Sequence, residues 1–244
     1  MSVDKVPAED RVRRTASSNR APWFDSIPMG YSTMSESTVT GTAAELPKTA
    51  RERGKIAPIK FAHIVFKTSR YDEMVKWYRT VLEAEAMSAS PMATFLTYDD
   101  EHHRIAIANI PGLADAPHQS AGMEHCAFTY ETLDDLLATF ERLSALDIHP
   151  YWCINHGPTL SMYYRDPDGN QVELQIDIFD SNAAVNAWFA ESDFDSNPIG
   201  VKFDPADLIQ RYRAGEDRST LLARPRIDPG QVMAQFPAPP EAAD

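Results

Sequence analysis

Residues 61–66 read FAHIVF and residues 123–128 read MEHCAF, and this pair of stretches decides the fold. When the sequence is shifted by 62 positions without gaps, His63 falls on His125 and Phe66 falls on Phe128. The stretch DEMV at 72–75 then falls on DDLL at 134–137, so the match continues through an amphipathic segment. Self-similarity at a fixed spacing indicates two copies of one structural unit.

Hydrophobic periodicity predicts the elements of each copy. In the first copy we predict a strand, a helix and two further strands at Ile59–Phe66, Ser69–Leu82, Thr94–Tyr98 and Arg104–Ile110. In the second copy we predict strand, helix and three strands at Glu124–Tyr130, Thr132–Leu146, Pro150–Ile154, Ser161–Arg165 and Gln171–Ile176. We therefore expect an α+β fold of two paired βαβββ modules, at about 58–112 and 121–178, that form an open, barrel-like mixed sheet around a metal site.

The modules are flanked by extensions. Residues 1–56 lack periodicity and are rich in small and polar residues, which predicts an arm that is partly disordered or lies on the domain as a strap. The paired modules occupy 57–180. The segment 181–244 is predicted to hold a helix at Ala183–Glu191 and a second helix that begins after Asp204-Pro205 and ends before Gly215. The last twenty residues contain five prolines, and we expect a loose tail.

Composition excludes several classes of function. The formal net charge is −13 and the pI is about 4.9, so a nucleic-acid backbone would be repelled. No apolar run approaches the roughly 20 residues that span a bilayer. Two cysteines are too few for a disulfide framework in 244 residues. We expect a cytoplasmic protein that binds neither nucleic acid nor membrane.

Three side chains form a predicted metal site. His63 and His125 occupy equivalent positions in the two copies, so a pseudo-twofold axis would let the imidazoles face each other. Glu173 follows the turn sequence DPDG at 166–169, which favours a tight hairpin. Because side chains alternate along a strand, Glu173 lies on the opposite face of the sheet from Val172. The equivalent strand of the first copy, residues 104–110, carries no carboxylate. Two histidines and one carboxylate are typical of non-haem Fe(II) oxygenases.

Residues 61–66, 123–128 and 163–173, the last reading YYRDPDGNQVE, resemble the vicinal oxygen chelate superfamily. That group includes glyoxalase I, fosfomycin and bleomycin resistance proteins, and type I extradiol dioxygenases. The stretch NHGPT at 155–159, followed by Tyr163, is most similar to the dioxygenases. The resemblance implies an extradiol-type dioxygenase that uses Fe(II), with Mn(II) as the other candidate, and O2 to cleave a catechol-like aromatic diol. It implies that His156 is the acid–base catalyst and that Tyr163 hydrogen-bonds a substrate oxygen.

Two other functions fit the same fold. One is a glyoxalase-like metal-dependent isomerase or transferase, and the other is a metal-free, resistance-type protein that binds an aromatic ligand. His102 and His103 follow three acidic residues, which favours a solvated turn. Cys126 should point away from His125, which favours a buried thiol over a ligand. Exposed sheet edges in paired modules favour a homo-oligomer.

Overall fold

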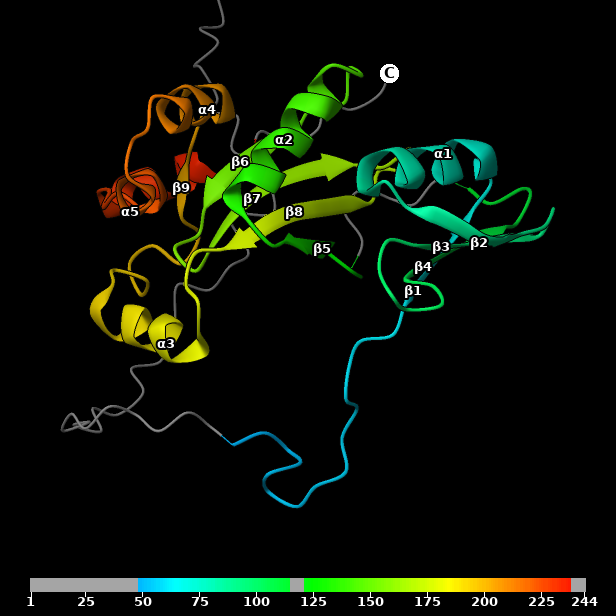
Figure 1. The fold of residues 1–244 in the computed structure, drawn as a ribbon, viewed down its shortest axis with the longest axis horizontal. Helices are drawn as coiled ribbons and strands as arrows, with labels where there is room; N and C mark the ends of the chain where they lie inside the picture. The colour runs from blue at the N-terminus through cyan, green and yellow to red at the C-terminus, as the bar shows by residue number, and fades with distance from the viewer. Residues whose placement is uncertain (1–47, 115–120, 238–244) are drawn as a thin grey trace, which may run out of the picture. The chain divides into compact units, whose positions relative to one another are not determined.

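The first module is a four-stranded sheet with one helix. A computed structural model describes residues 48–114 and 121–237. The module contains β1 (Ile64–Thr68), α1 (Tyr71–Leu82), β2 (Glu85–Ala89), β3 (Ala93–Thr97) and β4 (Ile105–Asn109). Its sheet has the order β1-β4-β3-β2, with β1 parallel to β4 and the other pairs antiparallel, and we call it the first sheet (Figure 1).

The second module repeats this plan. It contains β5 (His125–Tyr130), α2 (Leu133–Ser144), β6 (Trp152–Asn155), β7 (Thr159–Arg165) and β8 (Gln171–Asp177). Its sheet, the second sheet, has the order β5-β8-β7-β6-β9, in which β5 and β8 are parallel. The extra edge strand β9 (Val201–Lys202) comes from the C-terminal extension and pairs with β6.

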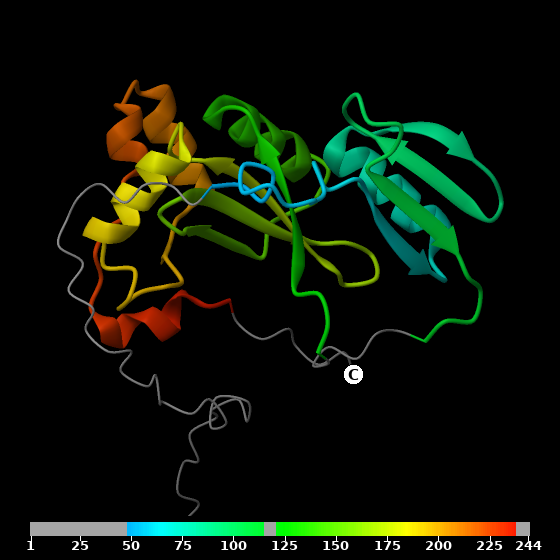
Figure 2. The ribbon, with the colours of Figure 1, turned by 90° about the horizontal axis from the view of Figure 1, so that it is seen from below.

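One helix packs on one face of each sheet, as the apolar stripes predict. Met74, Tyr78 and Val81 of α1 are fully buried, as are Leu136 and Leu143 of α2. Figure 2 shows α1 crossing the strands of the first sheet, and α2 contacts β5 and β8 of the second. The face of each sheet away from its helix therefore remains available for chemistry.

Polar contacts join the two modules. Arg142 of α2 donates from Nη1 to the Thr80 carbonyl at 2.6 Å and from Nη2 to the Val81 carbonyl at 3.0 Å, where α1 ends. The Tyr78 hydroxyl donates to Oδ2 of Asp166 at 3.1 Å. Carbonyls in the last turn of a helix accept no hydrogen bond from within that helix, so Arg142 of α2 provides the missing donors at the end of α1.

The DPDG stretch forms the predicted hairpin between β7 and β8. Oδ1 of Asp166 accepts hydrogen bonds from the backbone amides of Asp168 and Asn170 at 3.0 and 2.9 Å. Gly169 has a φ of +82°, in the left-handed region that glycine adopts without a steric cost. The turn thereby fixes the register of β8, and with it the position of Glu173.

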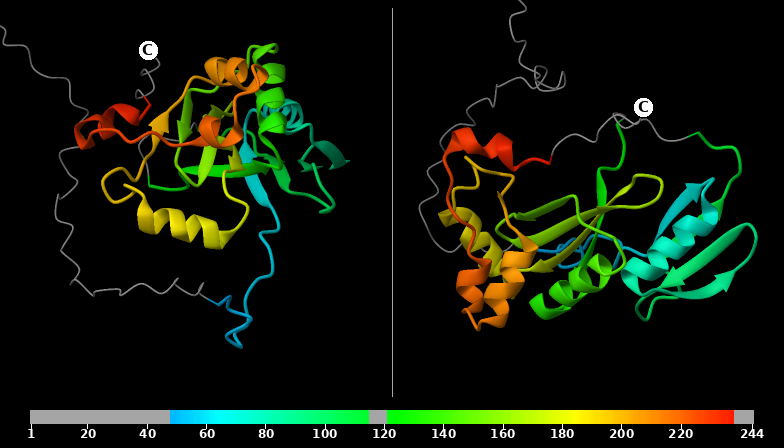
Figure 3. Two further views of the ribbon diagram at one scale, coloured as in Figure 1. Left: turned by 60° about the vertical axis from the view of Figure 1, so that its left-hand side comes forward. Right: turned by 90° about the horizontal axis from the view of Figure 1, so that it is seen from above.

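The C-terminal extension contains α3 (Asn182–Glu191), α4 (Pro205–Arg213), α5 (Arg218–Leu222) and the 3₁₀ helix η2 (Pro229–Gln235). Helix α4 packs against both α5 and α2 (Figure 3). Leu208, Ile209, Leu221 and Leu222 lie in the same hydrophobic core as α1 and α2. None of the helices in the described ranges combines the length and apolar character that a bilayer-spanning helix requires.

Most predicted elements are confirmed, with corrections. The α+β class and the paired modules are confirmed, although the strands of residues 48–114 and 121–237 form two separate mixed sheets where one barrel-like sheet was expected. Strand β2 was not predicted, because all five of its residues are exposed and show no alternation. Within the stretch predicted to be a loose tail, Pro229–Gln235 forms the 3₁₀ helix η2. The predicted arm at 1–56 lies outside the described residues up to residue 47, and the domain division at 57 and 181 stays a prediction.

Candidate metal and active site

His125 and Glu173 meet on the face of the second sheet away from α2. Strands β5 and β8 are parallel, and their register sets Ala127 opposite Glu173 and His125 opposite Gln171. His125 Nε2 lies 3.0 Å from Oε2 of Glu173, and the Glu173 side chain is only 5% exposed. A buried carboxylate requires a cationic or hydrogen-bonding partner. Imidazole nitrogen and carboxylate oxygen are also the donor types that non-haem iron takes, so this pair fits such a metal.

Residues beside this pair hold His125 in orientation. Nδ1 of His125 contacts Oε2 of Glu124, which leaves Nε2 directed at Glu173. Gln171 in turn donates from Nε2 to Oε1 of Glu124 at 2.6 Å and to the Glu124 carbonyl at 3.0 Å. A carboxylate on the far nitrogen of a histidine fixes its ring and raises its basicity as a ligand.

Tyr163 lies next to Glu173 in the same row of the sheet. It stands opposite Glu173 on β8 and opposite Trp152 on β6, so three neighbouring strands present a carboxylate, a phenol and an indole in a line. The Trp152 and Tyr163 rings are 4.7 Å apart between centroids. Burial and the neighbouring Glu173 carboxylate raise the pKa of Tyr163. Its hydroxyl therefore stays protonated and remains a hydrogen-bond donor.

His156 completes the group from the loop after β6. Its Nδ1 faces the Ile199 carbonyl, and its Nε2 lies 3.0 Å from the Tyr163 hydroxyl. Because a carbonyl only accepts, Nδ1 carries the proton and Nε2 presents a lone pair. Burial lowers the pKa of His156 from its usual 6.5, and the nearby Glu173 carboxylate opposes that change only in part. The imidazole is therefore neutral, and its Nε2 is free to accept a hydrogen bond or a proton.

Aromatic rings surround these groups. The Trp152 ring lies 5.8 Å from the His156 ring and stacks on Phe236 with centroids 6.4 Å apart. Trp152 Nε1 donates to the Gln235 carbonyl at 2.8 Å, so η2 and the residue after it hold the indole in place. A flat aromatic substrate would find matching surfaces here.

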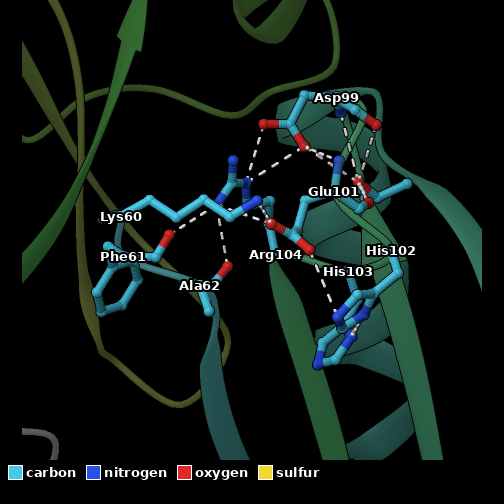
Figure 4. Close-up of polar contacts among 9 residues, drawn as sticks. Lys60, Phe61, Ala62, Asp99, Glu101, His102, His103 and Arg104 are labelled. Carbon is cyan, nitrogen blue, oxygen red and sulfur yellow. Dashed lines mark hydrogen bonds and ion pairs between the residues drawn. The ribbon is translucent and has the colours of Figure 1, made fainter. Parts of the chain in front are cut away.

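Figure 4 shows a polar cluster of the first module that includes His102, His103 and Arg104, and His63 contacts this cluster through the His103 ring. His63 is exposed just before β1, and its ring stacks on His103 with centroids 4.4 Å apart. Arg104 donates to the Phe61 carbonyl at 2.7 Å and to the Ala62 carbonyl at 3.1 Å, and these contacts fasten the segment that carries His63. His102 is exposed, in agreement with a solvated turn.

The structure thus brings together four of the five predicted site residues: His125, Glu173, His156 and Tyr163. Within residues 48–114 and 121–237, no three His, Cys, Asp or Glu side chains converge as a metal-binding group. The ligand role of His63 stays a prediction. Reasoning from the sequence missed Glu124, Gln171 and Ile199. Of these, only Glu124 could have been suspected from the sequence, because it is the neighbour of His125. The roles of the other two depend on contacts between residues far apart in the chain.

Known proteins resemble this chain. The family model described as Glyoxalase/Bleomycin resistance protein/Dioxygenase superfamily matches residues 60–174. Biphenyl-2,3-diol 1,2-dioxygenase 2 of Rhodococcus globerulus is 44% identical over 167 residues, which cover 67% of this chain and 88% of that protein. Biphenyl-2,3-diol 1,2-dioxygenase 3 of the same organism is 39% identical, covering 68% and 88%. The crystal structure of lactoylglutathione lyase from Agrobacterium tumefaciens is 21% identical and covers 49% of this chain and 94% of its own, with a TM-score of 0.40.

Proposed function

We propose that this chain, which belongs to the Glyoxalase/Bleomycin resistance protein/Dioxygenase superfamily, cleaves the ring of an aromatic diol with Fe(II) and O2. The sequence-based prediction of an extradiol-type dioxygenase is confirmed by the two biphenyl-2,3-diol 1,2-dioxygenases, at 44% and 39% identity. We infer the substrate class from the same relatives: a catechol-like ring with two adjacent hydroxyls. Cleavage beside one hydroxyl, with both oxygen atoms of O2 incorporated, would give a ring-opened muconic semialdehyde or a related dienoate.

The observation that carries the proposal is the row on the second sheet. Glu173, Tyr163 and Trp152 stand side by side on adjacent strands, with the His156 base 3.0 Å from the Tyr163 hydroxyl. Metal ligand, hydrogen-bond donor, base and aromatic surface are therefore within reach of one ring-sized molecule. A protein that only sequesters a ligand has no use for the buried carboxylate at this position.

The dioxygenase relatives imply a metal cofactor, and we assign it to Fe(II). His125 Nε2 and Glu173 Oε2 would hold it, because these two donor atoms already lie 3.0 Å apart and are of the types that non-haem iron binds. We propose His63 as the third ligand on the repeat alone, since it occupies the position in the first module that His125 occupies in the second. When bound, a ferrous ion with three protein ligands supplies Lewis acidity and open positions for substrate and O2.

The chain's own residues handle the protons. His156 Nε2 accepts a proton from one substrate hydroxyl, and the Nδ1 contact with the Ile199 carbonyl stabilises the imidazolium that results. Tyr163 keeps its proton; its hydroxyl donates to His156 Nε2 in this structure and would donate to a substrate oxygen once the substrate lies between them. Trp152 packs beside the ring and helps exclude water, which strengthens each of these polar interactions.

The test uses anaerobically purified full-length protein loaded with Fe(II). Biphenyl-2,3-diol should give oxygen uptake equal to the amount of yellow ring-opened product, whereas biphenyl-2,5-diol, whose hydroxyls are not adjacent, should give neither. No uptake with Fe(II) bound would overturn the proposal in favour of a glyoxalase-like isomerase or transferase. No bound metal would favour an aromatic-ligand binding protein. A cytoplasmic location and a homo-oligomeric state remain predictions beside this function.

A further inference from the structure

Arg224 lies far from the residues that the family model matches, yet it reaches the His156 loop. It follows α5, and its side chain is only 2% exposed. Its Nη1 donates to the Asn197 carbonyl at 2.9 Å and to the His156 carbonyl at 3.3 Å, and its Nη2 forms an ion pair with Asp193. A buried guanidinium with this many acceptors has a fixed position, because each lost contact would leave a charge unpaired.

The aromatic ring beneath Arg224 presses on the same loop. The guanidinium carbon lies 4.9 Å from the centre of the Trp188 ring. That ring touches Gly157 so closely that a Cβ there would meet it at 2.1 Å, and Gly157 adopts a φ of +105°. The residue after His156 can therefore only be glycine, and Trp188 and Arg224 together limit the movement of the loop.

Arg224 also acts on the carbonyl that orients the imidazole. The Asn197 side chain, which is buried, accepts from the Ile199 amide at 3.3 Å and from the Gly200 amide at 2.9 Å. This turn presents the Ile199 carbonyl to Nδ1 of His156. Because Arg224 binds the Asn197 carbonyl, it supports both the backbone of His156 and the group that selects its tautomer.

We propose that Arg224 is a positioning residue that holds His156 in the orientation and tautomer needed to accept the substrate proton. This inference rests on the proposed function and extends it to the C-terminal extension. An ordinary structural anchor would stabilise the protein without regard to His156. Removal of a positioning residue lowers turnover only when His156 is present, and this difference can be measured.

The experiment measures kcat, KM, bound Fe(II) and thermal midpoint for Arg224→Met, alone and combined with His156→Ala. We expect Arg224→Met to lower kcat by about ten- to a hundredfold, because small misplacement of a catalytic group is costly. KM and Fe(II) content should change little. In the His156→Ala background the same substitution should change kcat by less than about twofold, since no positioned base remains.

Two further variants keep the test decisive. Arg224→Lys preserves the charge but cannot make the contacts of both Nη1 and Nη2, so its kcat should lie between those of Arg224→Met and the wild-type protein. It replaces Arg224→Met if that variant fails to fold. Arg213 also lies in the C-terminal extension, and Arg213→Met removes an exposed ion pair with Glu141 of α2. This variant should leave kcat unchanged. An equal loss of kcat with and without His156, or no loss at all, would overturn the inference. Failure of the proposed function would appear separately, as a wild-type protein without turnover.

Discussion

The two modules share one topology and differ in what their equivalent positions carry. In the second sheet, one row across the strands runs Ala127, Glu173, Tyr163, Trp152. In the first sheet, the equivalent row begins at Val65, 62 positions before Ala127, and runs Val65, Ala106, Phe95, Ser88. The backbone register is the same, but a carboxylate and a phenol stand where the first sheet has an alanine and a phenylalanine.

The two modules therefore share their backbone positions, while the side chains at those positions decide whether a module can bind metal and substrate. Both modules need the same apolar stripe on the helix and the same parallel pair of strands to bury it. The row on the face away from the helix is free to differ, since its side chains do not belong to the apolar face that packs on the helix. The second sheet also gains β9 and the segments that hold His156 and Trp152. We therefore expect substitutions in the two rows to have unequal effects.

The largest expected effect comes from the carboxylate position. Glu173→Ala should lower turnover by more than about 10³-fold, because the Lewis acidity of the metal is lost with its ligand. Ala106→Ser, at the equivalent position in the first sheet, should keep turnover within about twofold of wild type. Oxygen uptake at saturating diol measures both. Similar losses in the two variants would show that the modules share the chemistry.

Removal of the base should have the next largest effect. His156→Ala should keep its Fe(II) but lose roughly 10²- to 10⁴-fold in kcat, the usual contribution of a positioned acid–base group. His103→Ala removes the histidine that stacks on His63 in the first module and should leave the proton transfer intact. Single-turnover absorbance of the ring-opened product makes the comparison. Full turnover in His156→Ala would exclude its acid–base role.

A smaller effect is expected where the modules meet. Arg142→Met removes two hydrogen bonds from a charged donor to the end of α1, at 2.6 and 3.0 Å. The free energy of unfolding should fall by about 1–3 kcal/mol, since the side chain is partly exposed. Urea denaturation measures it, with Arg213→Met as the control for loss of an exposed arginine. Equal values for the two variants would show that the helix-end contacts contribute nothing.

The smallest expected effect distinguishes the starts of the two helices. Thr132 and Asp135 form reciprocal hydrogen bonds at the start of α2, whereas the side chain of Arg70 forms no cap on α1. Thr132→Ala should destabilise the protein by about 1 kcal/mol, and Thr132→Ser should recover most of that. Thermal unfolding of the three proteins measures it. An unchanged thermal midpoint in Thr132→Ala would show that side-chain packing, and not the Thr132 cap, stabilises the start of α2.

The sequence predicted what depends on neighbours along the chain. The strands, both helices of the modules and the hairpin before Glu173 follow from periodicity and turn chemistry. Strand β2 was missed because it has no buried face, and η2 was missed because contacts with Trp152 and Lys202 hold it. These contacts join residues more than thirty positions apart, so no local pattern records them.

The same limit applies to the site. The repeat and the strand register predicted that His125 and Glu173 belong to one site, and the family resemblance added His156 and Tyr163. The Ile199 carbonyl and Arg224 reach His156 from the C-terminal extension, and neither follows from spacing. The repeat also predicts that His63 joins His125, and that role stays a prediction; in this structure the His63 ring stacks on His103.

The Fe(II) bound per chain after anaerobic reconstitution shows whether Glu173 holds the metal. We expect a stoichiometric ion in the wild-type protein and a loss to less than about a tenth of that in Glu173→Ala, because a non-haem site does not retain iron without its carboxylate. A full complement of Fe(II) in Glu173→Ala would contradict the proposal that Glu173 holds the metal.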